Sequence, residues 1–229
     1  MKVVDLFCGA GGFSEGFRQA GHDIAIGIDN WSTALTTIEM NHPGIITNNI
    51  DIEELSFLED DEFYKIIPKD TEIIIGSPPC VSFSNSNKSG KADKTLGIRL
   101  IESFFRIVAR VKFQKDSNLM YWIMENVPKS EKYIKDYYTS NDLKLNKFSF
   151  VQKLEVKIGN GINSGVYKSN LYGVPSRRNR YFCGDFPKPI EIETNPLLLG
   201  EILKIFENSG IIQDPVWENI QLKYKDITD

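Results

Sequence analysis

Cys80 is the residue whose setting points most clearly to chemistry. It directly follows Pro78 and Pro79, and before them stands a β-branched run, residues 73–75, that is typical of a buried strand of a parallel sheet. The two prolines end strand pairing and stiffen the exit. Because ligands bind at the carboxyl ends of strands in open α/β sheets, we expect Cys80 at the mouth of a crevice, as a nucleophile. The alternative is a buried structural cysteine.

Acidic side chains stand at the ends of other predicted strands. Asp29 follows a strand predicted over 22–28, where it can accept hydrogen bonds from ribose hydroxyls. Asp51 is flanked by isoleucines, and one acceptor between apolar walls suits an adenine ring. Glu125 follows a strand predicted over 119–124 and is a general-acid candidate. Taken alone, each could also be a surface carboxylate.

A glycine-rich turn, residues 8–12, separates a strand predicted over 2–7 from a helix predicted over 13–20. Strand, glycine turn and helix together receive nucleotide-like cofactors, because glycine lets the backbone approach the ligand closely. The spacing is not G-x-G-x-x-G, so a pyrophosphate is not indicated. A tight turn without a ligand remains the alternative.

Three arginines stand close together before a strand predicted over 181–183. Arg178 and Arg180 would share a face if they lay in that strand, and both could point at an anion or a base. A solvated basic face is the usual interpretation of such a cluster.

Alternating strands and helices must position these residues, which predicts an α/β fold with a mostly parallel twisted sheet. Further strands are predicted over 45–47 and 71–76, and further helices over 32–41, with Ser32 as N-cap, 53–67, 96–111 and 130–138. The sequence also predicts a polar functional loop over 81–94, a strand over 146–158 and a helix over 198–206.

Composition limits the function classes. The chain has 229 residues, 41% of them hydrophobic, which suffices for one sizeable core. Its net charge of −4 argues against the whole of a nucleic-acid-binding surface lying on this chain. Three widely spaced cysteines and two histidines indicate neither a disulfide framework nor a metal site. No signal peptide or membrane-length apolar run is present, so we expect an intracellular, cytoplasmic protein of bacterial or phage-like origin.

In order along residues 1–186, these segments resemble the cytosine-5 DNA methyltransferases. The matching segments are Asp5-Leu6-Phe7-Cys8-Gly9-Ala10-Gly11-Gly12-Phe13, Asp29, Asp51-Ile52, Gly76-Ser77-Pro78-Pro79-Cys80, Glu125-Asn126-Val127, Tyr172-Gly173-Val174-Pro175 and Arg177-Arg178-Asn179-Arg180. The resemblance implies a Rossmann-like class I methyltransferase fold. It also implies a catalytic and cofactor-binding domain over 1–186, and an extension over 187–229 leading toward a missing target-recognition region.

The resemblance implies S-adenosylmethionine as cofactor, S-adenosylhomocysteine as its product, and a cytosine of double-stranded DNA as substrate, in the setting of a restriction-modification system. The implied cofactor-binding residues are Phe7, Gly9, Gly11, Gly12, Asp29, Asn30, Asp51, Ile52, Pro78 and Leu100. The implied catalytic residues are Cys80, Glu125, Arg178 and Arg180, and no metal is implied.

The implied chemistry explains these residue types. The thiolate of Cys80 would attack C6 of cytosine and so make C5 nucleophilic, while Glu125 would hydrogen-bond or protonate N3. Arg180 would bind the O2 edge, with Arg178 in support. None of this can happen inside a stacked duplex, so the base must be flipped out.

The sequence departs from the family at three places. Val81 and Ser176 stand where the family usually has glutamine, and the chain stops at Asp229, where the recognition region should begin. We therefore expect one half of a split enzyme that needs a second polypeptide, or else a shortened chain. Transfer-RNA cytosine-5 methylation is the alternative activity. A catalytically inactive regulatory subunit is a third interpretation, against which the intact Cys80, Glu125 and Arg180 argue.

Overall fold

The computed structural model describes residues 1–80, 83, 94–148, 158–159, 161–174 and 176–192. The elements in chain order are β1 (Lys2–Leu6), α1 (Gly12–Gln19), β2 (Asp23–Asp29), α2 (Ser32–Asn41), β3 (Ile46–Asn49), α3 (Ile52–Phe57), α4 (Asp60–Ile66), β4 (Ile73–Gly76), α5 (Lys94–Lys112), β5 (Tyr121–Asn126), η1 (Pro128–Tyr133), β6 (Tyr137–Tyr138), η2 (Leu145–Lys147), β7 (Ile158–Gly159), β8 (Asn163–Lys168), η4 (Ser169–Tyr172) and β9 (Asn179–Asp185).

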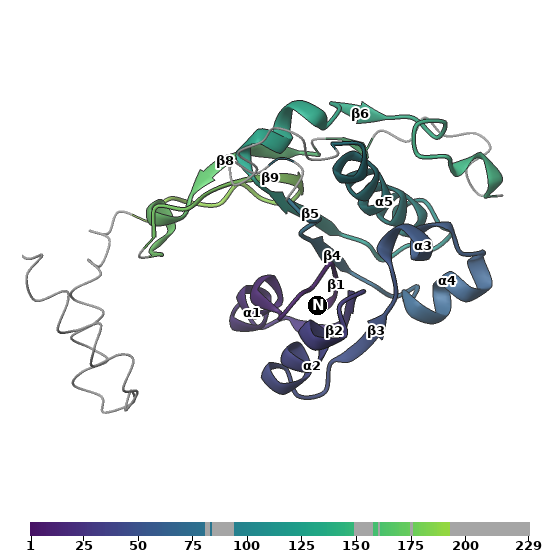
Figure 1. Cartoon of the computed structure of the whole chain (residues 1–229), viewed down its shortest axis with the longest axis horizontal. Coiled ribbons are helices and arrows are strands. Elements are labelled where there is room, and N and C mark those ends of the chain that lie inside the picture. Colours follow the sequence, from purple (N-terminus) through teal and green to yellow (C-terminus); the bar gives the residue numbers. More distant parts are fainter. Residues whose placement is uncertain (81–82, 84–93, 149–157, 160, 175, 193–229) are drawn as a thin grey trace, which may run out of the picture. The chain divides into compact units, whose positions relative to one another are not determined.

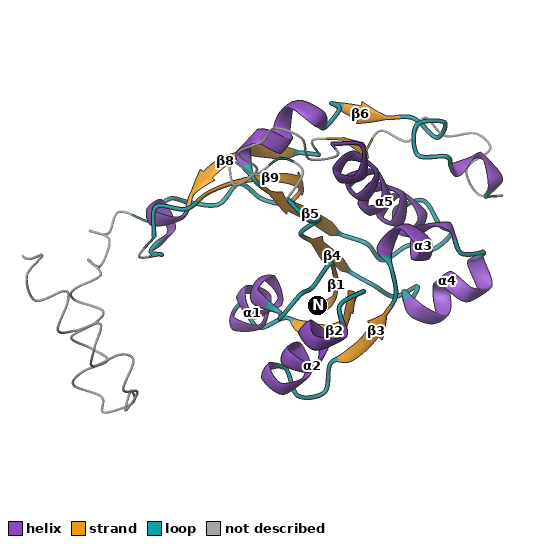
Figure 2. Cartoon of the chain, in the orientation of Figure 1, coloured by secondary structure: helices purple, strands orange, loops and turns teal. Residues whose placement is uncertain are grey.

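A seven-stranded sheet in the order β3-β2-β1-β4-β5-β9-β8 forms the framework (Figure 2). The first five strands pair in parallel, and β9 runs antiparallel to β5. The short strands β6 and β7 pair separately. The predicted α/β fold with a mostly parallel sheet is therefore confirmed.

The central strands are buried on both faces, which explains their continuous apolar sequences. On β4, Ile73 and Ile75 pack into a cluster that includes Phe13 and Phe17 of α1. Ile74 faces the opposite way, into the larger cluster beneath α3, α4 and α5. Figure 1 accordingly shows α1 and α2 on one side of the sheet and α3, α4 and α5 on the other. The carboxyl ends of β1, β2, β4 and β5 therefore meet at one edge of the sheet.

Two local predictions were wrong. The helix predicted over 53–67 is divided into α3 and α4, because the guanidinium of Arg110 binds the carbonyl oxygen of Ser56 at 3.0 Å and the carboxylate of Asp60 at 2.8 Å. Ser32 is not the N-cap of α2: Trp31 occupies that position without a side-chain cap. The backbone N–H of Trp31 is instead bound by Asp29 at 2.9 Å.

Other elements differ from prediction in extent. The helix predicted over 130–138 is the shorter 3₁₀ helix η1, followed by β6. The edge strand β8 was not predicted, because its polar residues and glycine hide the alternation. Of the strand predicted over 146–158, residues 149–157 lie outside the described residues, as do most of the predicted loop over 81–94 and the predicted helix over 198–206.

The chain divides into two compact units. The first comprises Met1–Tyr167 and Asn179–Pro189, and the second comprises Lys168–Arg178 and Ile190–Asp229, of which residues 193–229 are not described. Within the part that the structure describes, no helix has the length and apolar character needed to cross a membrane.

Candidate cofactor and nucleophile site

The turn between β1 and α1 has an unusual backbone that its glycines permit. Phe7, Gly9 and Gly11 all have positive φ angles, of 57°, 51° and 88°. A Cβ atom added to Gly11 would lie 2.7 Å from Ile38 and 2.9 Å from the imidazole of His42, so only glycine fits this left-handed and closely packed position. The turn is thus held against α2 after the carboxyl end of β1.

The outer side of this turn is open. A Cβ atom added to Gly9 or to Gly12 would meet no heavy atom within 4 Å among the described residues. Bare backbone beside open space allows a ligand to approach closely, and this fits the predicted cofactor.

Asp29 connects the glycine turn with the end of β2. One carboxylate oxygen accepts the backbone N–H of Gly9 at 2.9 Å, and the other accepts that of Trp31 at 2.9 Å. The residue is half-buried, and each oxygen retains a second lone pair. Asp29 can therefore bind a hydroxyl group of a ligand while it supports the turn.

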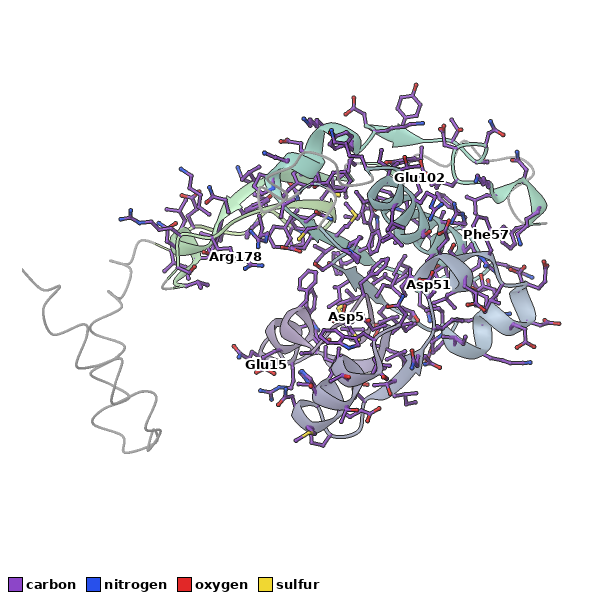
Figure 3. The ribbon with its side chains drawn as sticks, viewed as in Figure 1. Asp5, Glu15, Asp51, Phe57, Glu102 and Arg178 are labelled. Carbon is purple, nitrogen blue, oxygen red and sulfur yellow. The ribbon has the colours of Figure 1, made fainter. Side chains whose placement is uncertain are left out.

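Asp51 is the N-cap of α3. Its Oδ1 accepts the backbone N–H groups of Glu53 at 2.8 Å and Glu54 at 3.3 Å, and its Oδ2 accepts the side-chain amide of Asn30 at 3.0 Å. Figure 3 shows Asp51 beside α3. The structure thus brings together the predicted cofactor-binding residues Asn30 and Asp51, whereas Ile52 is buried beside them at 2% exposure.

Cys80 lies where the sequence predicts, on the exit from β4 after Pro78 and Pro79. It is half-buried and carries a free thiol. The buried Pro78 is fixed through its carbonyl oxygen, which accepts the side-chain amide of Asn126 at 3.0 Å. The carbonyl oxygen of Cys80 accepts the backbone N–H of Phe83 at 2.9 Å. Neighbours on both sides therefore hold the loop that carries the thiol.

The other two cysteines are unsuited to nucleophilic chemistry. Cys8 and Cys183 are buried, and burial raises the pKa of both thiols far above the usual range. Since the thiolate is the reactive form, these two residues are held as inert neutral thiols. Cys80 is thus the accessible thiol of the chain.

Glu125, at the end of β5, is bound at both carboxylate oxygens. Its Oε1 lies 2.8 Å from Nε of Arg180, and its Oε2 accepts the hydroxyl of Ser77 at 2.5 Å. Both charged side chains are mostly buried, with 17% exposure for Glu125 and 22% for Arg180. Antiparallel pairing of β5 with β9 places Arg180 here, since Glu125 stands opposite Phe182 in the ladder. The structure therefore joins two of the predicted catalytic residues directly.

Arg178 directly precedes β9, which begins at Asn179, so the condition under which it would share a strand face with Arg180 is not met. It belongs to the second compact unit, where its backbone exchanges hydrogen bonds with Ser169. Figure 3 shows its side chain on the segment that precedes β9. Its predicted catalytic role stays a prediction.

Sequence reasoning missed two residues beside the site. Ser77, the partner of Glu125, was visible only as part of the motif before Cys80. Asp5 is fully buried in β1 beneath the glycine turn, where its Oδ2 accepts the hydroxyl of Ser14 at 2.6 Å and its Oδ1 has no partner among the described residues. Burial raises the pKa of Asp5 to about 7, against the opposing effect of the Ser14 hydrogen bond. No pattern in the sequence indicates that the carboxyl group of this residue is buried.

The remaining predicted cofactor-binding residues have apolar side chains that cannot donate hydrogen bonds. Leu100 of α5 is buried, as is Pro78. No group of three or more potential metal ligands occurs among the described residues. The arrangement therefore offers backbone, carboxylates, one thiol and one guanidinium for chemistry.

Comparison with known proteins identifies sequence relatives. The model of the family "C-5 cytosine-specific DNA methylase" matches residues 1–224. Type II methyltransferase M.HgiGI of Herpetosiphon aurantiacus is 40% identical over 134 residues, which are 57% of this chain and 93% of that relative. M.HindV of Haemophilus influenzae is 33% identical over 79% of this chain and 51% of its own length. M.DdeI of Desulfomicrobium norvegicum is 33% identical over 80% of this chain and 40% of its own length.

The chain thus spans about half or less of the length of the last two relatives. Among solved structures, a DNA modification methyltransferase encoded within a prophage (E. coli) superposes with a TM-score of 0.61. That match has 23% sequence identity and covers 89% of this chain and 54% of the other, so it supports the fold alone.

Proposed function

The chain belongs to the C-5 cytosine-specific DNA methylase family, and on this premise we propose that it transfers a methyl group to C5 of a cytosine flipped out of duplex DNA. The observation that carries the proposal is that Cys80 leaves β4 at the same edge where Ser77 and Arg180 hold Glu125. A nucleophile and a fixed acid at neighbouring strand ends are what addition to the C5–C6 bond of cytosine requires. The names of the relatives, Type II methyltransferases, support a role in restriction-modification.

Cys80 is the nucleophile of this proposal. Its thiolate forms a bond to C6, the C5–C6 π electrons move toward N3, and N3 takes a proton from the carboxyl group of Glu125, so that C5 becomes nucleophilic. After C5 has gained the methyl group, the C5 proton leaves to a base, its electron pair restores the double bond, and the thiolate departs from C6. The burial of Cys8 and Cys183 supports this choice of thiol.

Glu125 and Arg180 bind the base. Glu125 holds the proton at N3, and Arg180, already bonded to Glu125 through Nε, binds the O2 edge with its remaining donors. Ser77 fixes the second carboxylate oxygen of Glu125. A supporting catalytic role for Arg178 remains part of this proposal, on the strength of the family motif alone.

S-adenosylmethionine, when bound, supplies an electrophilic methyl group. The open backbone at Gly9 and Gly12 supports its placement over the glycine turn. Asp29 accepts the ribose hydroxyls, and Asp51, oriented by Asn30, accepts the amino group of the adenine. The residues that complete this site are Phe7, Gly11, Ile52, Pro78 and Leu100.

A second polypeptide that carries the target-recognition region completes the enzyme in this proposal. A duplex binder must neutralise phosphates, whereas this chain has a net charge of −4. Among the described residues, β8 is the last strand at this side of the sheet; Val166 in it is 43% exposed, and Ile162, just before the strand, is 78% exposed. An open strand edge with apolar side chains is suited to association.

Methyl transfer to DNA tests the function. Duplex DNA is incubated with methyl-labelled S-adenosylmethionine and the chain, alone and with the product of the neighbouring reading frame, and is then digested to nucleosides. We expect the label in 5-methyl-2′-deoxycytidine, and we expect Cys80→Ser to abolish it while retaining cofactor binding. Label in a methylated adenine or in N4-methylcytosine, or transfer only to transfer RNA, would contradict the proposal.

A further inference from the structure

We propose that Lys94, Lys132 and Tyr133 form a binding site for a phosphate group of the DNA strand that carries the target base. This inference deepens the proposed function and rests on it. No residue of the site belongs to the catalytic or cofactor-binding sets described above.

The two ammonium groups lie near the same tyrosine ring. The ammonium nitrogen of Lys94 lies 6.0 Å from the centre of the Tyr133 ring, and that of Lys132 lies 5.2 Å from it. Desolvation alone would raise the pKa of Tyr133, but hydrogen bonds and charge from the two lysines lower it. The Tyr133 side chain thus lies near two cations, and its phenol O–H can serve as a third donor.

This arrangement is unfavourable without an anion. The two ammonium groups lie near one ring and repel each other. Neither lysine has an ion-pair partner among the described residues, whereas nearby Lys135 pairs with Asp142 at 2.7 Å. Lys94 is also the first residue of α5, where the helix dipole opposes a cation, and the first turn of α5 contains no acid. Two cations and a hydroxyl donor suit a phosphate, which is a multivalent acceptor.

The same site is connected to the nucleophile. The ring of Tyr133 stacks on that of Phe83, with centroids 4.9 Å apart and an interplanar angle of 30°. The backbone N–H of Phe83 in turn donates to the carbonyl oxygen of Cys80 at 2.9 Å. A phosphate held by the lysine pair would therefore be fixed relative to Cys80.

Tyr133 is also close along the chain to the acid. It ends η1, which begins directly after the segment that contains Glu125 and Asn126, and Asn126 binds the carbonyl oxygen of Pro78 at 3.0 Å. The site is thus attached to both catalytic segments. This is why we assign it to the strand that bears the target base rather than to a distant phosphate.

The salt dependence of duplex binding tests the site. For the chain with the proposed partner polypeptide, we expect the double variant Lys94→Gln, Lys132→Gln to reduce the steepness of the plot of log affinity against log salt by about one to two. We also expect it to weaken duplex binding about tenfold near physiological salt. Lys94→Arg with Lys132→Arg should retain most of the slope. Binding of S-adenosylhomocysteine should be unchanged in both variants.

Lys115→Gln is the matched control, because this exposed lysine follows the other end of α5, a helix of 19 residues and about 28 Å. If the slope of log affinity against log salt is the same in wild type, the double glutamine variant and the control, the phosphate site is overturned while the proposed function stays intact. Equal weakening by Lys115→Gln would also overturn it, since general charge would then explain the effect. If wild type neither binds nor methylates duplex DNA, the proposed function itself fails.

Discussion

At the scale of single residues, the candidate site is made of side chains that already have partners. Glu125 is bound by Arg180 and Ser77, Asp29 by two backbone N–H groups, and Asp51 by Asn30 and the start of α3. Each carboxylate is therefore oriented before a ligand arrives. Such preorganisation lowers the ordering cost of binding and favours reaction.

Asn30→Ala should weaken cofactor binding without unfolding the protein. The exposed amide of Asn30 holds Oδ2 of Asp51 at 3.0 Å, and the loss of one such hydrogen bond corresponds to about 1 kcal/mol. We expect an increase of about fivefold in the Kd for S-adenosylhomocysteine by calorimetry, with an unchanged melting temperature. Asn146→Ala, which removes an exposed side-chain hydrogen bond to Asn141, is the control and should change neither the Kd nor the melting temperature. An unchanged Kd for Asn30→Ala would remove Asn30 from the cofactor site.

Arg180→Gln should separate chemistry from cofactor binding. Glu125 would keep Ser77 but lose its charged partner, so the acid would be misplaced relative to N3. We expect kcat for methyl transfer to fall by about a hundredfold or more, with no change in the Kd for S-adenosylhomocysteine. Arg18→Gln breaks an exposed ion pair with Glu15 and should leave kcat unchanged. A kcat near the wild-type value for Arg180→Gln would exclude the proposed role.

At the scale of elements, the turn between β1 and α1 is where we propose that the cofactor approaches the backbone. Gly11→Ala forces a Cβ atom to within 2.7 Å of Ile38 at a φ of 88°, so we expect a loss of at least about 2 kcal/mol in the free energy of unfolding. Gly12→Ala meets no atom within 4 Å and should fold normally, yet its methyl group should weaken cofactor binding. Urea unfolding and calorimetry measure both variants. Equal stability of the two variants would contradict this account of the turn.

Asp5 should make the same elements sensitive to pH. Its pKa is about 7 when folded and about 4 when unfolded, so between these values the folded protein holds a proton that the unfolded chain has lost. The contribution of Asp5 to stability is therefore full below about pH 4 and is lost as the pH rises to about 7. A difference of about three pKa units corresponds to roughly 4 kcal/mol in the free energy of unfolding for this fully buried group.

Asp5→Asn isolates this effect, because asparagine keeps the size of the side chain and cannot titrate. The free energy of unfolding of wild type minus that of Asp5→Asn should decrease as the pH rises from 4.5 to 7.5, in urea titrations at several pH values. Other titrating groups cancel in this difference. A difference that is independent of pH would show that Asp5 titrates normally.

At the scale of the whole molecule, the positions of the central strands could be predicted from the sequence, whereas the partners of the side chains could not. The apolar runs predicted the central parallel strands, and the residues that follow them placed Asp29, Cys80 and Glu125 at the strand ends. The contact of Glu125 with Ser77 spans 48 residues, and its contact with Arg180 depends on the antiparallel return of β9. Similarly, the break between α3 and α4 depends on Arg110 of α5. These features arise from pairing between distant segments, which local sequence patterns do not encode.

The most direct test of the central claim is a covalent trap at Cys80. A long duplex in which every cytosine is replaced by 5-fluorocytosine presents all recognition sequences, and fluorine cannot leave C5 as a cation. The chain, alone and together with the proposed partner polypeptide, is incubated with this duplex and S-adenosylmethionine, and digested adducts are mapped by mass spectrometry. We predict a methylated 5-fluorocytosine adduct on the peptide that contains Cys80, and no adduct with Cys80→Ser. An adduct on Cys8 or Cys183, or trapping that persists in Cys80→Ser, would contradict the account.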